Sequence, residues 1–129
     1  IANTPIVSIS GTATTTPVTP TEYSLNSAAT TNAAVIKAST GQVHAVWLSN
    51  EGAGTAYVKL FNKATTPTVG TDIPAITIPV AAGAFVSLDL GAVGQRFGTG
   101  LGIAITGAMV HTDTAAVAAN QVKVKLTYI

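Results

Sequence analysis

Apolar and polar residues alternate along much of the chain, most densely in the region 43–80. A period of two over six to eight residues, rich in Val, Trp, Tyr and Phe, is typical of antiparallel β-strands. The first run has two candidate faces, one formed by Val43, Ala45 and Trp47 and the other by His44, Val46 and Leu48. The run 56–61 alternates in the same way. The pattern predicts two strands here and a third that ends at Val80.

The segment Glu51–Gly54 separates the first two runs and contains two glycines. Glycine adopts the positive φ angles that hairpin loops of three to five residues require. The sequence therefore predicts a β-hairpin of 43–48 with 56–61, followed by a Thr/Pro-rich loop that crosses to the third strand.

Alternation predicts further strands on both sides of this region. They are 33–38 with Val35 inward, 84–90 with Val86, Leu88 and Leu90 on one face, 101–106 with Leu101, Ile103 and Ile105, and 121–129 with Val122, Val124, Leu126 and Tyr128. The glycine-rich segment 91–102 is interpreted as irregular, and 111–119 as a polar, alanine-rich loop with room for one helical turn. Seven or eight short strands with Gly, Pro and Thr turns and no helical period predict an all-β fold, an antiparallel β-sandwich.

The first 32 residues lack sustained alternation and contain Pro17 and Pro20. We expect an extended Thr/Pro-rich N-terminal arm over residues 1–32 and one β-sandwich domain over residues 33–129. Within the arm, a short β-prone run is the candidate for contact with a neighbouring subunit or a shell, by addition to an exposed sheet edge. It consists of Ile6, Val7 and Ile9. The alternative is a flexible leader.

Three segments resemble small all-β structural proteins of tailed-bacteriophage virions: Lys59–Lys63, Pro67–Asp72 and Ala118–Val122. The similarity covers residues 33–129 and implies a jelly-roll form of the sandwich. It also implies a non-enzymatic structural role, as a homotrimer that binds the major capsid protein or another virion protein. Within this class it favours a capsid decoration or head-fibre protein over a neck or tail component. The expected location is the virion, assembled in the cytoplasm of the bacterial host.

Composition narrows the classes of partner. Charged residues make up 9% of the 129 residues, hydrophobic residues make up 47%, and the formal net charge is +1. This balance gives no electrostatic reason to expect nucleic acid or an anionic membrane as a partner. The most apolar window, 73–86, contains two prolines and is shorter than the ~20 residues of a membrane-spanning helix. High hydropathy with few charges favours a protein that buries part of its surface in an assembly.

No residue pattern predicts catalysis, a metal site or a cofactor. Cysteine is absent, which excludes thiolate ligands and cysteine nucleophiles. His44 and His111 lack a partner at metal-ligand spacing, so we interpret them as an exposed strand histidine and a loop histidine. The carboxylates are expected in turns or on outward strand faces, where capping and solvated roles are normal. They are Glu22, Glu51, Asp72, Asp89 and Asp113.

Trp47 is the one tryptophan and the candidate for stacking against a sugar ring. Its neighbours on the predicted face are Val43 and Ala45, so the pattern favours core packing, and aromatic residues total only 5%. Lys123 and Lys125 lie on one face of the last strand, where we interpret them as protection of an exposed edge against aggregation. A host- or glycan-recognition module displayed on the virion is the alternative function.

Overall fold

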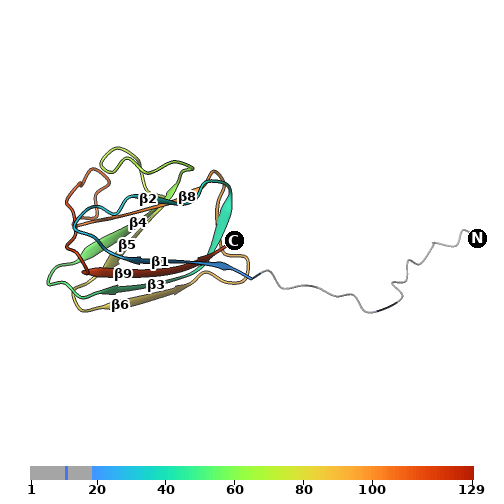
Figure 1. Ribbon diagram of the computed structural model, residues 1–129, viewed down its shortest axis with the longest axis horizontal. Coiled ribbons are helices and arrows are strands. Elements are labelled where there is room, and N and C mark those ends of the chain that lie inside the picture. The colour runs from blue at the N-terminus through green and yellow to red at the C-terminus, as the bar shows by residue number, and fades with distance from the viewer. Residues whose placement is uncertain (1–10, 12–18) are drawn as a thin grey trace, which may run out of the picture.

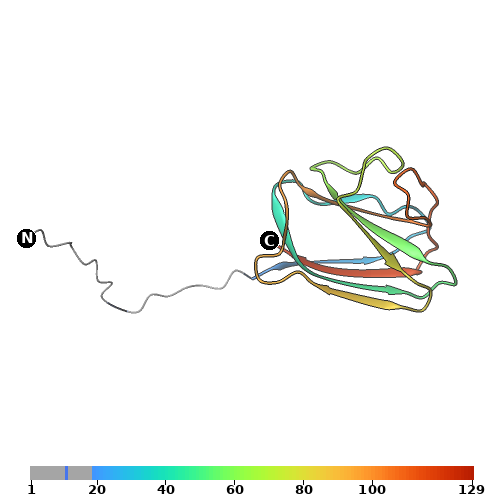
Figure 2. The same cartoon turned by 180° about the vertical axis from the view of Figure 1, so that it is seen from behind.

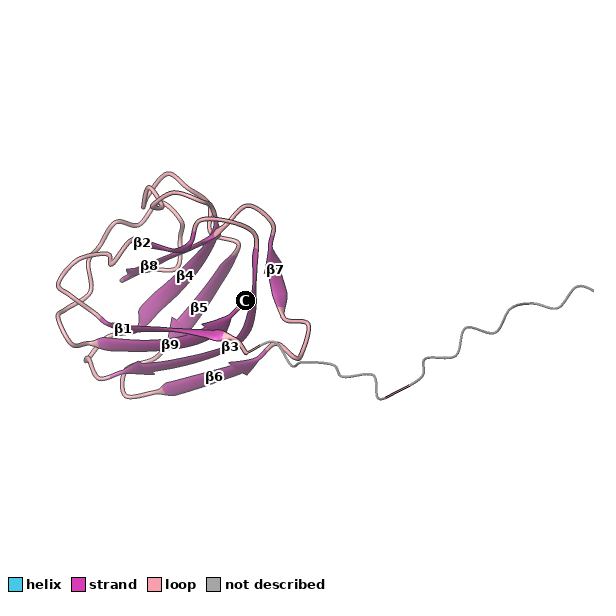
Figure 3. Ribbon diagram, turned by 45° about the vertical axis from the view of Figure 1, so that its right-hand side comes forward, coloured by secondary structure: helices cyan, strands magenta, loops and turns pink. Residues whose placement is uncertain are grey.

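The computed structural model describes Gly11 and residues 19–129. Every regular element in this part of the chain is a β-strand, and all pairings are antiparallel (Figure 3). The strands are β1 (Thr21–Asn26), β2 (Ala34–Lys37), β3 (Gly41–Asn50), β4 (Ala56–Asn62), β5 (Ile76–Val80), β6 (Phe85–Asp89), β7 (Gln95–Phe97), β8 (Leu101–Thr106) and β9 (Val122–Tyr128). The predicted all-β, antiparallel β-sandwich is confirmed.

The strands form two layers (Figures 1 and 2). Sheet A is five-stranded, with the order β1-β9-β3-β6 and the short β7 paired to the start of β3. Sheet B is four-stranded, with the order β2-β8-β4-β5. Among the described strands, β4 and β5 are the only consecutive pair that is hydrogen-bonded together. Most other connections therefore carry the chain from one sheet to the other.

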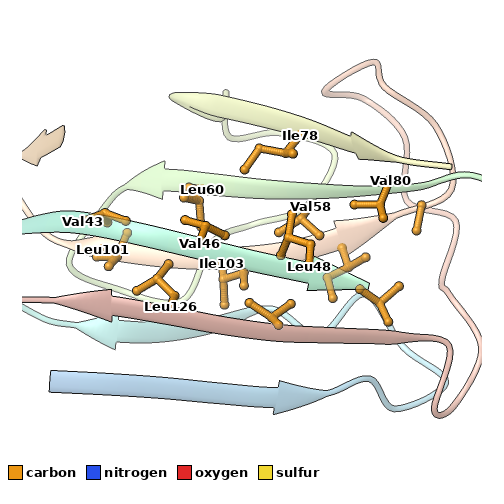
Figure 4. Packing of buried hydrophobic residues seen from close by; sticks show 14 of the residues in the cluster. Val43, Val46, Leu48, Val58, Leu60, Ile78, Val80, Leu101, Ile103 and Leu126 are labelled. Atoms are coloured by element: carbon orange, nitrogen blue, oxygen red, sulfur yellow. The ribbon is translucent and has the colours of Figure 1, made fainter. Parts of the chain in front are cut away.

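Alternate residues of both sheets fill the space between the layers with aliphatic side chains (Figure 4). The fully buried ones include Leu48, Val58, Leu101, Ile103, Ile105, Val122 and Leu126, each 0% exposed. Burial of each such side chain stabilises the fold by about 1.5–3 kcal/mol. The inward faces predicted for 101–106 and for 121–129 are confirmed.

The predicted hairpin between 43–48 and 56–61 is wrong. β3 pairs with β9, β6 and β7 in sheet A, whereas β4 pairs with β5 and β8 in sheet B. The glycine-containing turn Glu51–Gly54 therefore crosses between the two sheets. The partner of β4 across a long loop is β5, the strand that ends at Val80.

The side chain of Asn50 fixes this crossing. It is 2% exposed, and its Nδ2 donates to the carbonyl oxygens of Gly54 and Val80, both at 2.8 Å. Its Oδ1 accepts from the backbone N–H of Gly52 at 2.9 Å. A buried amide with these partners ties the end of β3 to the far sheet, because breaking the set would leave polar groups unpaired in the interior.

A β-bulge changes the faces of β3. The register of β3 against β9 shifts between Val43 and Ala45, and one extra residue in a strand turns the following side chains to the opposite face. Val43, Val46 and Leu48 belong to the core (Figure 4), whereas Trp47 does not. The prediction that Val43, Ala45 and Trp47 share one face is wrong.

The sandwich includes residues that the sequence pattern assigned to the arm. β1 pairs with β9 along its whole length, and its Tyr23 and Leu25 pack against the core. The boundary expected between residues 32 and 33 is therefore wrong, because the domain already includes Thr21. The arm residues expected to contact a shell lie outside the described part of the chain: Ile6, Val7 and Ile9.

Two smaller differences concern β2 and β7. Ala34 and Ile36 of β2 pack against the core, so the inward assignment of Val35 is wrong. The register of β2 against β8 also shifts between Val35 and Lys37. β7 occupies a segment predicted to be irregular, and its Phe97 is 1% exposed. One buried aromatic in a glycine-rich stretch gave too little alternation to identify this strand.

Candidate functional surfaces

The two outer faces of the sandwich differ in what covers them. Lys59 and Phe61 alternate with core residues of β4 and so point away from the interior, yet they are only 1% and 2% exposed. The loops 63–75 and 107–121 lie over sheet B (Figure 1) and provide this burial. The outer face of sheet B is therefore covered over the central part of β4.

An apolar contact places the loop 63–75 against sheet B, and two hydrogen bonds to one carboxylate fix the shape of the loop. The ring of Pro67 lies against Gly102 of β8, where a Cβ on the glycine would come within 2.7 Å of Pro67 Cγ. The carboxylate of Asp72 accepts from Lys63 Nζ and, at 2.7 Å, from the backbone N–H of Thr68. The hydrogen bond from Lys63, followed by that from Thr68, lowers the pKa of Asp72 below its ordinary value.

The loop 107–121 is attached through the buried lysine of β4. Lys59 Nζ donates to the carbonyl oxygen of Val110 at 2.8 Å. Burial lowers the pKa of Lys59, and the negative charge of Asp113 acts in the opposite direction. Asp113 itself accepts from the backbone N–H of Ala108 at 2.9 Å. The loop therefore passes over the ammonium group of Lys59, and this hydrogen bond anchors it to β4.

The segment Ala118–Val122 leads into β9 and is tied to the end of β1. Ser27, just after β1, donates from its Oγ to the carbonyl oxygen of Ala118 at 2.8 Å. The same Oγ accepts from the backbone N–H of Val122 at 3.0 Å. The segments Lys59–Lys63 and Pro67–Asp72 contribute Lys59, Lys63 and Asp72 to the loop contacts described above. All three segments therefore contain residues that hold the fold and its loops together.

The outer face of sheet A is open, and all its side chains are exposed or half-buried. It consists of Glu22, Ser24 and Asn26 from β1, Thr127, Lys125 and Lys123 from β9, Ala45, Trp47 and Ser49 from β3, and Asp89, Ser87 and Phe85 from β6. The loops that cover the other sheet lie on the far side of the sandwich (Figures 1 and 2).

Trp47 lies in the middle of the open face. Its cross-strand partners are Lys125 on β9 and Ser87 on β6. Phe85, which is 65% exposed, pairs with Ser49 and so lies diagonal to Trp47 on the same face. The expectation of core packing for Trp47 is wrong, because the bulge places the indole on the outer face. Phe85 was not predicted as a functional residue.

The charges of the open face compensate one another. Lys125 Nζ lies 3.4 Å from a carboxylate oxygen of Glu22, and Lys123 Nζ lies 2.6 Å from one of Glu51. The side chains of these pairs are 47–61% exposed, so each pair adds at most about 1 kcal/mol to stability. β9 lies between β1 and β3. The interpretation of the two lysines as protection of an exposed edge is therefore wrong.

A hollow of about 530 Å³ opens at one end of the same face. It is lined by Pro20, His44, Ala45, Asp89, Gly91, Ala92 and Ile129. Nδ1 of His44 lies 3.1 Å from the carbonyl oxygen of Gly91, and its Nε2 is buried without a hydrogen-bond partner among the described residues. Asp89 Oδ1 accepts from the backbone N–H of Gly91 at 2.9 Å. No sequence pattern identified this hollow, because its residues come from distant segments.

The structure does not bring the chemistry-bearing residues together. Among the described residues, no group of three or more His, Asp or Glu side chains is placed to hold a metal ion. His111 is exposed in the loop over sheet B, whereas His44 lies at the end of sheet A. The predicted turn-capping role is confirmed for the carboxylates that accept from nearby backbone N–H groups, which are Asp72, Asp89 and Asp113.

Comparisons with known proteins gave no match: no family model, curated protein or solved structure is significantly similar to this chain. The described residues also contain no helix with the length and apolarity needed to span a membrane.

Proposed function

We propose that the protein is a non-enzymatic structural protein of a tailed-phage virion, a capsid decoration or head-fibre protein that assembles as a homotrimer on the shell. The observation that carries this proposal is the strand order of the sandwich, taken with the resemblance of residues 33–129 to virion proteins. The partners are further copies of the chain and the major capsid protein or another virion protein.

The strand order supports the jelly-roll interpretation. In a jelly roll, eight strands form two Greek keys that fold across two facing sheets, and viral capsid proteins use this architecture widely. Here β1-β9-β3-β6 faces β2-β8-β4-β5, with β7 as an addition beside β3, and this arrangement of two facing four-stranded antiparallel sheets supports a jelly roll. Lectin domains use the same architecture, so the fold alone does not choose between a shell protein and a recognition module.

Exposed apolar side chains on the loops over sheet B support self-association. Ile73 is 75% exposed, and Met109 and Val110 are 59% and 61% exposed. Large apolar side chains at the surface of a chain with only 9% charged residues favour burial against a partner. The two loops also touch each other where the methyl group of Thr114 lies against Gly70. Because the loops 63–75 and 107–121 touch each other, they offer one joint surface for subunit contact.

Two measurements test the proposal. Analytical ultracentrifugation at micromolar concentration is expected to show a trimer that Ile73→Ser with Met109→Ser dissociates; a stable wild-type monomer would exclude the trimer. Immunogold labelling of virions from the host that carries the gene is expected to place the protein on heads, and virions without it should release DNA at a lower temperature. Absence of the protein from purified particles would refute the virion role.

A further inference from the structure

The open face of sheet A combines features that point to a carbohydrate ligand. An indole at its centre and a phenyl ring diagonal to it offer apolar surfaces for the C–H face of a sugar ring. Around them lie short hydroxyl and amide side chains that donate and accept hydrogen bonds: Ser24, Asn26, Ser49, Ser87 and Thr127. Aromatic rings next to polar groups bind ligands with one apolar and one hydrated side. Sugars have that character.

The charge pattern favours a neutral ligand. The two lysines of the face are paired with Glu22 and Glu51, so neither is left to attract an anion such as a phosphate or a uronic acid. The remaining charge of the face is Asp89 at its end, where a carboxylate accepts hydrogen bonds from hydroxyl groups. The same charged residues make the face a poor core for a protein–protein interface, where charged groups are depleted.

The hollow and the aromatic rings lie in line. Ala45 and Asp89 line the hollow and are cross-strand partners on the open face. Trp47 follows Ala45 on the same face of β3, at about 6.7 Å along the strand. From Asp89 to Phe85 along β6 the distance is about 13 Å. The track therefore accommodates a short run of sugar units, one in the hollow and the next on Trp47.

We infer that the outer face of sheet A binds a neutral glycan chain along the track from the hollow at His44 and Asp89, across Trp47, to Phe85. The rings stack on the sugar, and Asp89 accepts a hydroxyl hydrogen bond in the hollow. This site does not depend on the virion role, because it uses the sheet opposite the loops proposed for subunit contact.

Binding is measured first with the intact protein. Trp47 is the one tryptophan of the chain, so intrinsic fluorescence reports directly on the proposed site. The probes are dextran, amylose, mannan, galactan, xylan and hydroxyethyl cellulose, with heparin as an anionic comparison. At least one neutral probe is expected to shift the emission to shorter wavelength and reduce quenching by acrylamide. Failure of all six neutral probes, or a response to heparin alone, would overturn the inference.

Variants then locate the site by affinity electrophoresis in gels that contain the responsive polysaccharide. Trp47→Ala is expected to weaken binding about tenfold and Phe85→Ala about threefold, whereas Trp47→Phe keeps most of the affinity. Pro79→Ala, a truncation of an exposed apolar residue on β5 of the other sheet, is the matched control and should bind as the wild type does. Circular dichroism checks that each variant is folded.

Three outcomes would contradict the site. Equal loss of binding in Pro79→Ala would show a nonspecific apolar effect, and unchanged binding in Trp47→Ala would remove the stacking platform. Dissociation of the oligomer by Trp47→Ala would identify the face as a contact between copies of the chain. Each result differs from failure of the virion proposal, which is judged on particles and on the loops of sheet B.

Discussion

Neighbouring residues on β3 provide a direct test of the bulge. Leu48 is 0% exposed and lies in the core, whereas Trp47 is half-buried on the outer face. Leu48→Ala removes a buried side chain and leaves a cavity, which costs about 2–5 kcal/mol. Trp47→Ala removes cross-strand contacts with Lys125 and Ser87, each worth at most about 1 kcal/mol. We therefore expect Trp47→Ala to lower the free energy of unfolding by only about 1 kcal/mol, less than Leu48→Ala does, although tryptophan is the larger side chain.

Urea unfolding followed by far-UV circular dichroism measures both changes, because Trp47→Ala removes the fluorophore. For a chain of 129 residues, 1 kcal/mol corresponds to about 4 °C in Tm, so Leu48→Ala should melt at least 8 °C lower and Trp47→Ala about 4 °C lower. The urea dependence should stay constant, since both variants expose nearly the same surface on unfolding. A loss for Trp47→Ala as large as that for Leu48→Ala would place the indole in the core and refute the bulge.

Three further predictions concern titration and the domain boundary. Because burial lowers the pKa of Lys59 in the folded state, the unfolded state binds more protons between the folded and unfolded pKa values, and stability rises with pH there; urea midpoints of Lys59→Met should lack this alkaline rise. The pKa of Asp72 is lowered from 3.8, so its contribution is present above pH 3.8 and is lost as pH falls through the folded pKa; Asp72→Asn should show a smaller acid loss in the same assay. Deletion of residues 1–18 should leave a cooperative thermal transition, whereas deletion of residues 1–32, which includes β1, should abolish it or lower it strongly; a fully stable product of the longer deletion would show that β1 is dispensable.

The inward face of β9 was predicted correctly because one face of this strand is buried and the other is solvated. In β9, Val122, Val124 and Leu126 alternate with the exposed Lys123 and Lys125, and this contrast makes the period of two visible. β3 gave no such contrast, because apolar residues occupy both of its faces before and after the bulge. Local alternation cannot reveal a one-residue insertion whose only trace is the spacing of three between Val43 and Val46.

The sequence pattern failed to predict the pairing of β3 and β4 for a different reason. Two alternating runs joined by a glycine turn are equally compatible with a hairpin in one sheet and with a crossing between sheets. The choice is made by the buried hydrogen bonds of Asn50, whose partner Val80 is distant in sequence. Such contacts exist only once both sheets are assembled. The pattern therefore predicted the turn but not the sheet that the following strand joins.

The candidate surface around Trp47 was also only partly predictable, because local sequence identified the residue but long-range contacts decide its exposure. Trp47 was identified from composition as a stacking candidate, but the decision between core and surface depended on the bulge. That the face around it is open depends on where the loops 63–75 and 107–121 fold, and they lie over sheet B through contacts such as Pro67 with Gly102 and Lys59 with the carbonyl oxygen of Val110. The face around Trp47 is thus accessible because these loops pack on the opposite sheet. Substitutions that release the loops should therefore alter the proposed subunit contacts before they alter the Trp47 face.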